Sequence, residues 1–135
     1  MEEKMEDSIF TKIIKGDIPC HKSYEDDKTI AFLDIYPVQP GHVLVVPKSQ
    51  VPTFMDLDDD YATALWNSIR KVAQRLREAY PDKKRIAMAI EGFDVDHAHA
   101  HLIPVDTHAE FMNPQDTNGE PDHLALAELA KKLAL

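Results

Sequence analysis

A single long stretch of helical periodicity divides this chain of 135 residues into two groups of short strand-like segments. Between Asp58 and Pro81, apolar residues recur three or four positions apart, the spacing of one helix face: Tyr61, Leu65, Ile69, Val72, Leu76 and Ala79. Acidic residues at positions 58–60 favour the start of a helix through its dipole, and Pro81 stops it. We therefore expect one long helix in this region.

Five segments around this helix have the composition of short strands. They are rich in β-branched residues or alternate between apolar and polar residues, and they are bounded by proline, glycine or polar turns. These segments are His21–Tyr24, Thr29–Asp34, His42–Val46, Arg85–Ile90 and His97–Val105. Strands that mostly follow one another, with one long helix inserted, favour an α+β domain with a five-stranded antiparallel sheet.

Two further helices are expected near the ends of the chain. A short N-terminal helix over Ile9–Lys15 has Asp7 or Ser8 as its cap and Gly16 at its end. A C-terminal helix begins at Asp122 and carries leucines and an alanine on one side: Leu126, Leu129, Ala130 and Leu133. We expect one domain over residues 1–135, with a core at about 8–105 and a C-terminal tail, 106–135, that contains the last helix.

Charge and cysteine content limit the function. The net charge is −9, whereas a nucleic-acid-binding protein normally has a basic face. Apolar runs such as Val43–Val46 are too short to cross a membrane, and the acidic start Met1–Asp7 is unlike a signal peptide. The single cysteine, Cys20, excludes an internal disulfide. These features predict a cytoplasmic protein that binds neither nucleic acid nor membrane.

The run from His97 to Pro104 carries the clearest chemical signal. Alternate side chains of a strand point to one face, so His97, His99 and His101 are expected to project together. Neighbouring imidazoles disfavour protonation of one another, which keeps at least one neutral and nucleophilic near pH 7. His42, at the start of an earlier apolar strand, is a candidate fourth member.

The residues alone leave three interpretations of this run open. The histidines are unrelated surface or core residues, or they bind zinc or iron with help from Asp94 or Asp96. In the third interpretation they catalyse a reaction at phosphorus, where one neutral imidazole attacks and a neighbour protonates the leaving group.

The histidine run and three other blocks closely resemble the histidine triad (HIT) family of nucleotide hydrolases and transferases. The triad pattern matches His97–Ile103, and the other blocks are Ser8–Pro19, Ala31–Pro37 and Pro40–Lys48, in family order over roughly residues 8–105. The resemblance implies the HIT-like α+β fold with its five-stranded antiparallel sheet, usually joined to a second copy in a homodimer.

The resemblance also implies roles for individual residues. His99 would attack the α-phosphorus of a nucleotide and form a nucleotidyl-histidine that water hydrolyses. His101 would contact the phosphate and the leaving group, while His97 and His42 support the triad. Asp34 would accept hydrogen bonds from the ribose hydroxyls. The base pocket would be walled by four apolar residues: Phe10, Phe32, Ile35 and Leu44.

Three departures from the family pattern stand out. Ile90-Glu91-Gly92 replaces a common Asn-x-Gly, and only residues 93–96 separate it from His97, where many members have a longer phosphate-contacting loop. Asp94 and Asp96 in this short loop would repel a phosphate. The chain thus looks like a short-loop bacterial branch of the family. The positions that bind a structural zinc in some relatives correspond here to Ser8, Thr11 and Gln50, so that site is expected to be absent.

We therefore expect an enzyme that cleaves a purine nucleoside monophosphate, AMP or GMP, from a phosphoramidate or a phosphoanhydride. It would act as a nucleoside phosphoramidase or in the manner of a dinucleoside polyphosphate hydrolase, with no cofactor and no metal. The alternatives are a nucleotide-binding or interaction protein with little turnover, and a histidine-ligated metal protein.

Overall fold

The computed structural model describes residues 6–135. Residues 1–5, which hold most of the acidic start that is unlike a signal peptide, lie outside the described residues. The sheet has the strand order β1-β2-β3-β5-β4, and every neighbouring pair is antiparallel. Its strands are β1 (Lys22–Glu25), β2 (Thr29–Leu33), β3 (Val43–Pro47), β4 (Arg85–Ala89) and β5 (Ala100–Val105). The expected α+β fold with a five-stranded antiparallel sheet is confirmed.

The three expected helices are present, and two short turns of helix were not foreseen. The helices are α1 (Ile9–Ile14), α2 (Asp59–Ala79) and α4 (His123–Leu133), and the short turns are a 3₁₀ turn, η1 (Phe54–Asp56), and α3 (His108–Phe111). Ser8 rather than Asp7 caps α1, because its side chain accepts a hydrogen bond from the Thr11 amide. α3 is held by a capping box between Thr107 and Glu110, a local signal in the polar tail that hydrophobic periodicity does not reveal.

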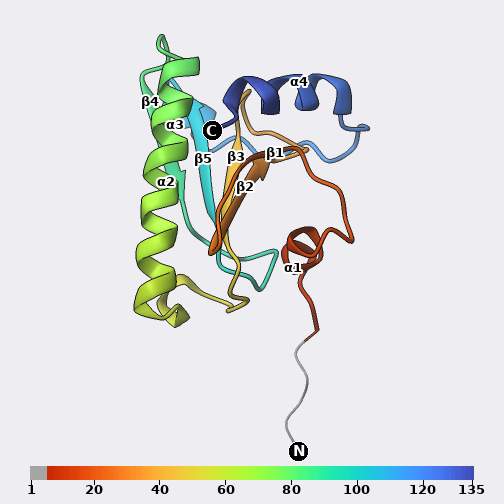
Figure 1. The fold of residues 1–135 in the computed structure, drawn as a ribbon. Coiled ribbons are helices and arrows are strands. Elements are labelled where there is room, and N and C mark those ends of the chain that lie inside the picture. Colours follow the sequence, from red (N-terminus) through yellow and green to blue (C-terminus); the bar gives the residue numbers. More distant parts are fainter. Residues whose placement is uncertain (1–5) are drawn as a thin grey trace, which may run out of the picture.

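Helices lie on both faces of the sheet (Figure 1). The large core lies between one face and the helices α2 and α4, where Leu76, Leu102 and Leu133 are buried together. On the other face α1 lies alone and brings Phe10 into a smaller cluster with Phe32 and Leu44. This second face, with less cover, is where the histidine run meets α1.

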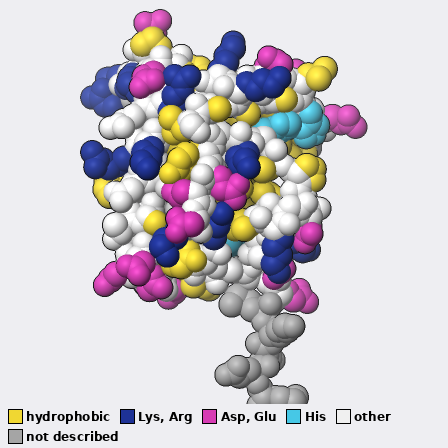
Figure 2. All heavy atoms as spheres, in the orientation of Figure 1, with side chains coloured by type: hydrophobic (Ala, Val, Ile, Leu, Met, Phe, Trp, Pro, Cys, Tyr) yellow, Lys and Arg dark blue, Asp and Glu magenta, His cyan; other side chains and the backbone are white. Residues whose placement is uncertain are grey.

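The surface carries charges of both signs. On the face shown in Figure 2, basic and acidic side chains alternate without a continuous basic band. Among the described residues, no helix combines the length and the apolar character needed to cross a membrane.

The loop between β2 and β3 is held by a glycine that tolerates no side chain. Gly41 has φ +89°, and a Cβ atom there would lie 2.7 Å from Cε2 of Tyr80 and 3.0 Å from Cγ of Pro104. The close approach of this loop to the end of α2 and to β5 fixes the backbone from which His42 projects. Gly16 has a similar φ of +84°, but a Cβ atom there would have no neighbouring atom within 4 Å.

We predict that Gly41→Ala destabilises the protein by about 2–4 kcal/mol, because backbone strain adds to overpacking against Tyr80. Gly16→Ala, the matched control, should cost only about 1 kcal/mol, because it introduces the strain alone. Urea unfolding of both variants measures the difference. Equal losses would show that the Tyr80 ring moves aside freely.

Candidate active site

The histidine run lies at the start of β5, and its first part is outside the strand. The expected strand His97–Val105 begins only at Ala100, so the prediction that all three histidines share one strand face is wrong for His97 and His99, which precede the strand. The β3–β5 ladder ends at the pair Val45–Ala100. Beyond it, Pro47 of β3 has no N–H to donate, and its carbonyl is taken by the His97 ring.

His97 is held at both ring nitrogens. Its Nε2 lies 2.7 Å from the Pro47 carbonyl oxygen, which can only accept, so Nε2 carries the proton. Its Nδ1 is then an acceptor, and the Ser8 hydroxyl donates to it at 2.6 Å. The His97 side chain is fully buried, which makes it a support of the site rather than a reacting group.

One ring nitrogen of His99 is left without a proton. Its Nδ1 lies 2.7 Å from the His97 carbonyl oxygen, so the ring proton is on Nδ1 and Nε2 has the free lone pair. Nε2 of His99 has no hydrogen-bond partner among the described residues. It is not a fully buried atom, because the one fully buried side-chain nitrogen or oxygen without a partner in these residues is Ser23 Oγ. Nε2 is therefore open to solvent, although only 4% of the His99 side chain is exposed.

A relay of hydrogen bonds fixes the proton of His101. The Val38 amide donates to Nδ1 of His42 at 3.1 Å, so His42 carries its proton on Nε2. That Nε2 lies 2.9 Å from Nδ1 of His101, which must therefore accept. The proton of His101 is left on Nε2, which faces Oε1 of Glu91 at 3.6 Å. The His101 ring also lies edge-on to the His99 ring, with centroids 4.9 Å apart.

Burial keeps these imidazoles neutral. It lowers the pKa of His42 from 6.5 to about 3, with a smaller contribution from His101. Burial also lowers the pKa of His97 and that of His101, in both cases helped by His99. At pH 7 these groups act as fixed hydrogen-bond donors and acceptors.

Two sets of side chains come close enough to share a metal ion, but the hydrogen bonding opposes both. One set is Asp34, His42 and His101, and the other is Glu91, His99 and His101. The hydrogen bond from the Val38 amide places the protons of His42 and His101 on their Nε2 atoms. A metal ion binds only an unprotonated nitrogen, so these Nε2 atoms are poor ligands. The carboxylate in the second set is Glu91, whereas the sequence had suggested Asp94 or Asp96. The arrangement suits imidazole chemistry better than metal binding.

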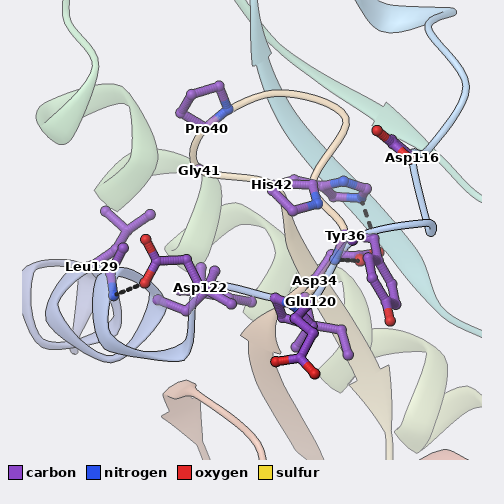
Figure 3. Close-up of a pocket in the computed structure, with 16 residues that line it drawn as sticks. Asp34, Tyr36, Pro40, Gly41, His42, Asp116, Glu120, Asp122 and Leu129 are labelled. Carbon is purple, nitrogen blue, oxygen red and sulfur yellow. Dashed lines mark hydrogen bonds and ion pairs between the residues drawn. The ribbon is translucent and has the colours of Figure 1, made fainter.

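Asp34 lies at the end of β2 beside His42, on the rim of a cavity of about 420 Å³ between the β2–β3 loop and the segment before α4 (Figure 3). Its Oδ1 accepts from the Tyr36 amide at 2.8 Å, and its Oδ2 accepts from the Gln115 side chain at 2.9 Å. Burial raises its pKa. Gln115, an exposed residue of the polar tail, was not predicted to reach the site, since no sequence pattern pairs position 115 with position 34.

The four apolar residues expected to wall a base pocket separate into two groups. Phe10, Phe32 and Leu44 are buried in one cluster, and the Phe10 ring meets the His99 ring edge-on at 4.8 Å between centroids. Ile35 is 38% exposed and lines the cavity beside Asp34 instead. The structure thus brings Phe10 against the triad, with Phe32 packed behind it and Leu44 paired with His101 in the sheet, and leaves Ile35 beside the neighbouring cavity.

The chain is similar to known proteins in both sequence and fold. The family model of the HIT domain matches residues 15–108. The Bacillus subtilis protein named protein hit is 33% identical, over 96% of both chains. An adenosine 5′-monophosphoramidase of Schizosaccharomyces pombe is 39% identical, over 71% of this chain and 72% of that protein. A Hit-like protein of Bartonella henselae, described as involved in cell-cycle regulation, has a crystal structure that superposes with a TM-score of 0.78, at 32% identity over 94% of both chains.

We predict that the stability of the protein falls as the pH drops below 6.5. A histidine with a lowered pKa in the folded state binds protons mainly when unfolded, so His42 alone should cost roughly 2 to 3 kcal/mol between pH 7 and pH 4.5. Urea unfolding at both pH values measures the loss. The loss should be smaller in His42→Asn and unchanged in His108→Asn, a matched variant of an exposed histidine. An identical loss in all three proteins would contradict the assignment.

Proposed function

This chain belongs to the histidine triad (HIT) family, and from that premise we propose that it is a nucleotide hydrolase that releases a nucleoside monophosphate, AMP or GMP, through a nucleotidyl-histidine on His99. The observation that carries the proposal is the free lone pair on Nε2 of His99, fixed there because Nδ1 donates its proton to the His97 carbonyl. Relatives named adenosine 5′-monophosphoramidase support the nucleotide substrate.

The proposed reaction has two steps. The lone pair on Nε2 of His99 forms a bond to the α-phosphorus, while the bond from phosphorus to the leaving nitrogen breaks and leaves its electron pair on that nitrogen, which takes up one proton. Water then attacks the adduct, the bond from phosphorus to Nε2 breaks, and one proton is released. One water is consumed for each nucleoside monophosphate and amine produced.

The neighbouring residues have distinct roles in this proposal. His101 donates a hydrogen bond from Nε2 to the group on phosphorus, and His42 holds it in that tautomer. Asp34 accepts hydrogen bonds from the ribose hydroxyls once these displace the Gln115 amide. Phe10, Phe32 and Leu44 support the base from the side of α1, and Ile35 from the side of the cavity.

The charge beside His101 favours an amine as the leaving group. Oε1 of Glu91 lies 3.6 Å from Nε2 of His101, and Asp94 is close enough to influence the charge of the same ring. Carboxylates there oppose the departure of an anion such as sulfate or phosphate and tolerate a neutral amine. We therefore favour a phosphoramidate over a phosphoanhydride as the substrate.

The protein is also proposed to be a single-domain homodimer. β4 is an outer strand of the sheet, so its edge is available for pairing. Beside it lies an apolar recess that Trp66, Phe54 and Ile90 line, and Trp66 is 53% exposed. A second copy of the chain paired at this edge would remove the apolar side chains of the recess from water, which favours a dimer.

We predict that His99→Ala lowers AMP release from adenosine 5′-phosphoramidate by roughly a thousandfold or more, because the attacking group is lost. Mass spectrometry of the trapped protein should find an adenylyl adduct on His99 in the wild type. His108→Ala, which removes an exposed histidine on α3, is the matched control. Tight AMP binding without release would favour a binding protein, and release that a chelator abolishes would favour a metal enzyme.

We further predict that Glu91→Gln changes the preference among leaving groups. The rate with adenosine 5′-phosphosulfate, relative to the phosphoramidate, should rise about tenfold, the effect of removing about 1.4 kcal/mol of repulsion. Glu128→Gln, which neutralises an exposed glutamate on α4, should leave the ratio unchanged. An unchanged ratio in Glu91→Gln would place the leaving group away from this carboxylate.

A further inference from the structure

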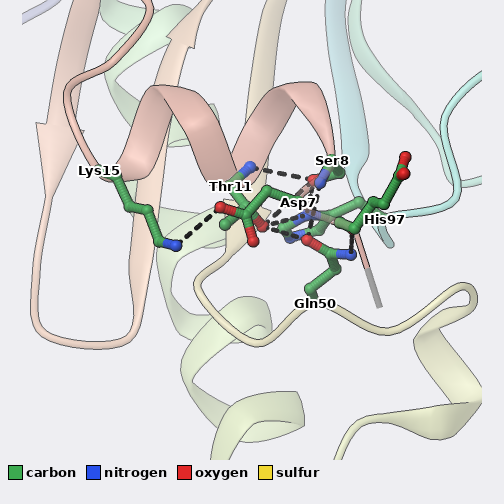
Figure 4. A network of polar contacts seen from close by, with 7 residues as sticks. Asp7, Ser8, Thr11, Lys15, Gln50 and His97 are labelled. Atoms are coloured by element: carbon green, nitrogen blue, oxygen red, sulfur yellow. Dashed lines mark hydrogen bonds and ion pairs between the residues drawn. The ribbon is translucent and has the colours of Figure 1, made fainter. Parts of the chain in front are cut away.

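A polar cluster joins the start of α1 to the segment that follows β3 and ends on the ring of His97. It consists of Ser8, Thr11 and Gln50, and Figure 4 shows the three side chains converging on that ring. Ser8 Oγ lies 2.6 Å from Nδ1 of His97, and Thr11 Oγ1 lies 2.5 Å from Oε1 of Gln50. None of these three residues contributes an atom to the reaction proposed above.

The distances decide where the proton of Ser8 lies. Nδ1 of His97 has no proton and lies 2.6 Å from Ser8 Oγ, whereas the other acceptor within reach, Thr11 Oγ1, lies 3.2 Å away, so the Ser8 hydroxyl donates to His97. Ser8 Oγ in turn accepts the Thr11 amide at 3.0 Å. The Thr11 hydroxyl donates to Oε1 of Gln50, which also accepts the Ser8 amide at 2.9 Å. The Gln50 amide is oriented by the Glu6 carbonyl at 2.7 Å. The proton of Ser8 is thereby directed at His97.

His97 transmits this order to the nucleophile through the main chain. Its ring is fixed between Ser8 and the Pro47 carbonyl, and its own carbonyl oxygen accepts the Nδ1 proton of His99. The next amide, that of Ala98, donates to the Val51 carbonyl at 2.8 Å. Without the contacts of its ring, the main chain at His97 would be held less firmly, and with it the carbonyl that decides which nitrogen of His99 is free.

We propose that Ser8 is a positioning residue of the active site, oriented by Thr11 and Gln50, whose donated hydrogen bond holds His97 in the neutral form and the orientation that His99 requires. The inference rests on the proposed function in so far as it takes His99 as the nucleophile. It gives α1 a second task besides packing Phe10 against the sheet.

The competing explanation is that Ser8 only caps α1. A cap accepts a hydrogen bond from a backbone amide, whereas the proposed role requires Ser8 to donate one to an imidazole. Aspartate separates the two, because it caps a helix as well as serine does but has no proton to donate when ionised. Its charge would instead favour the protonated form of His97. Threonine keeps both abilities.

The experiment compares Ser8→Ala, Ser8→Asp and Ser8→Thr in AMP release from adenosine 5′-phosphoramidate over a range of pH. We expect kcat to fall about tenfold or more in Ser8→Ala and in Ser8→Asp with little change in KM, since small misplacements of a reacting group are costly. In Ser8→Asp the acid limb of the profile should also move to higher pH, and Ser8→Thr should retain activity. Thr107→Ala, which removes the cap of α3, is the control for the loss of a cap.

Nitrogen NMR of the histidine rings gives a readout that needs no substrate. The wild type should show His97 protonated at Nε2 alone, and Ser8→Asp should show it protonated at both nitrogens at a pH where the wild type is neutral. Wild-type kcat, pH profile and ring spectrum in Ser8→Asp would reduce Ser8 to a helix cap and overturn the inference. If the wild type releases no AMP, the proposed function fails, while the ring spectra still decide the role of Ser8.

Discussion

The hydrogen bond from Nδ1 of His99 to the carbonyl of His97 is the interaction on which the site depends. A carbonyl oxygen can only accept, so the bond places the lone pair of His99 on Nε2 as long as the backbone at His97 stays where it is. The Pro47 carbonyl and the Ser8 hydroxyl hold that backbone through the His97 ring. The proposed nucleophile is therefore oriented by main-chain geometry and not by a charged neighbour.

The same logic extends to the second half of the site. The Val38 amide can only donate, and through His42 it leaves the proton of His101 on Nε2. Two backbone groups, one acceptor and one donor, thus give the neighbouring rings opposite roles: a lone pair on His99 and a proton on His101. A charged imidazole carries a proton on both nitrogens and would break both relays. Burial disfavours the charged form, so it favours the neutral rings that the proposed chemistry requires. The folded state becomes sensitive to acid as a consequence.

Periodicity in the sequence was enough to predict the sheet and the long helix. The gathering of His99, His101 and His42 was expected from the histidine run and from the resemblance to the HIT family. Periodicity could not predict where the strand of the histidine run begins, because that depends on Pro47 in another strand. The sequence could not predict two further contacts, that of Gln115 with Asp34 and that of Glu91 with His101. Each contact joins segments that only the folded chain brings together, and no local sequence pattern indicates it. As a group, Ser8, Thr11 and Gln50 stood out in the sequence only as the positions of a zinc site that was expected to be absent. Their hydrogen bonds to one another and to His97 depend on how α1 packs against the segment after β3.

The rings of the site and the carboxylate beside them differ in charge, and this difference bears on the proposed leaving group. The protons of the imidazoles are fixed by the backbone. Oε1 of Glu91 lies 3.6 Å from Nε2 of His101, in the loop that continues through Gly92 to Asp94 and Asp96. A carboxylate near the leaving group destabilises a departing anion, whereas it does not repel an amine that leaves uncharged. In the proposed reaction the short loop therefore selects among leaving groups, while the proposed nucleophile, His99, is held by contacts that this loop does not make.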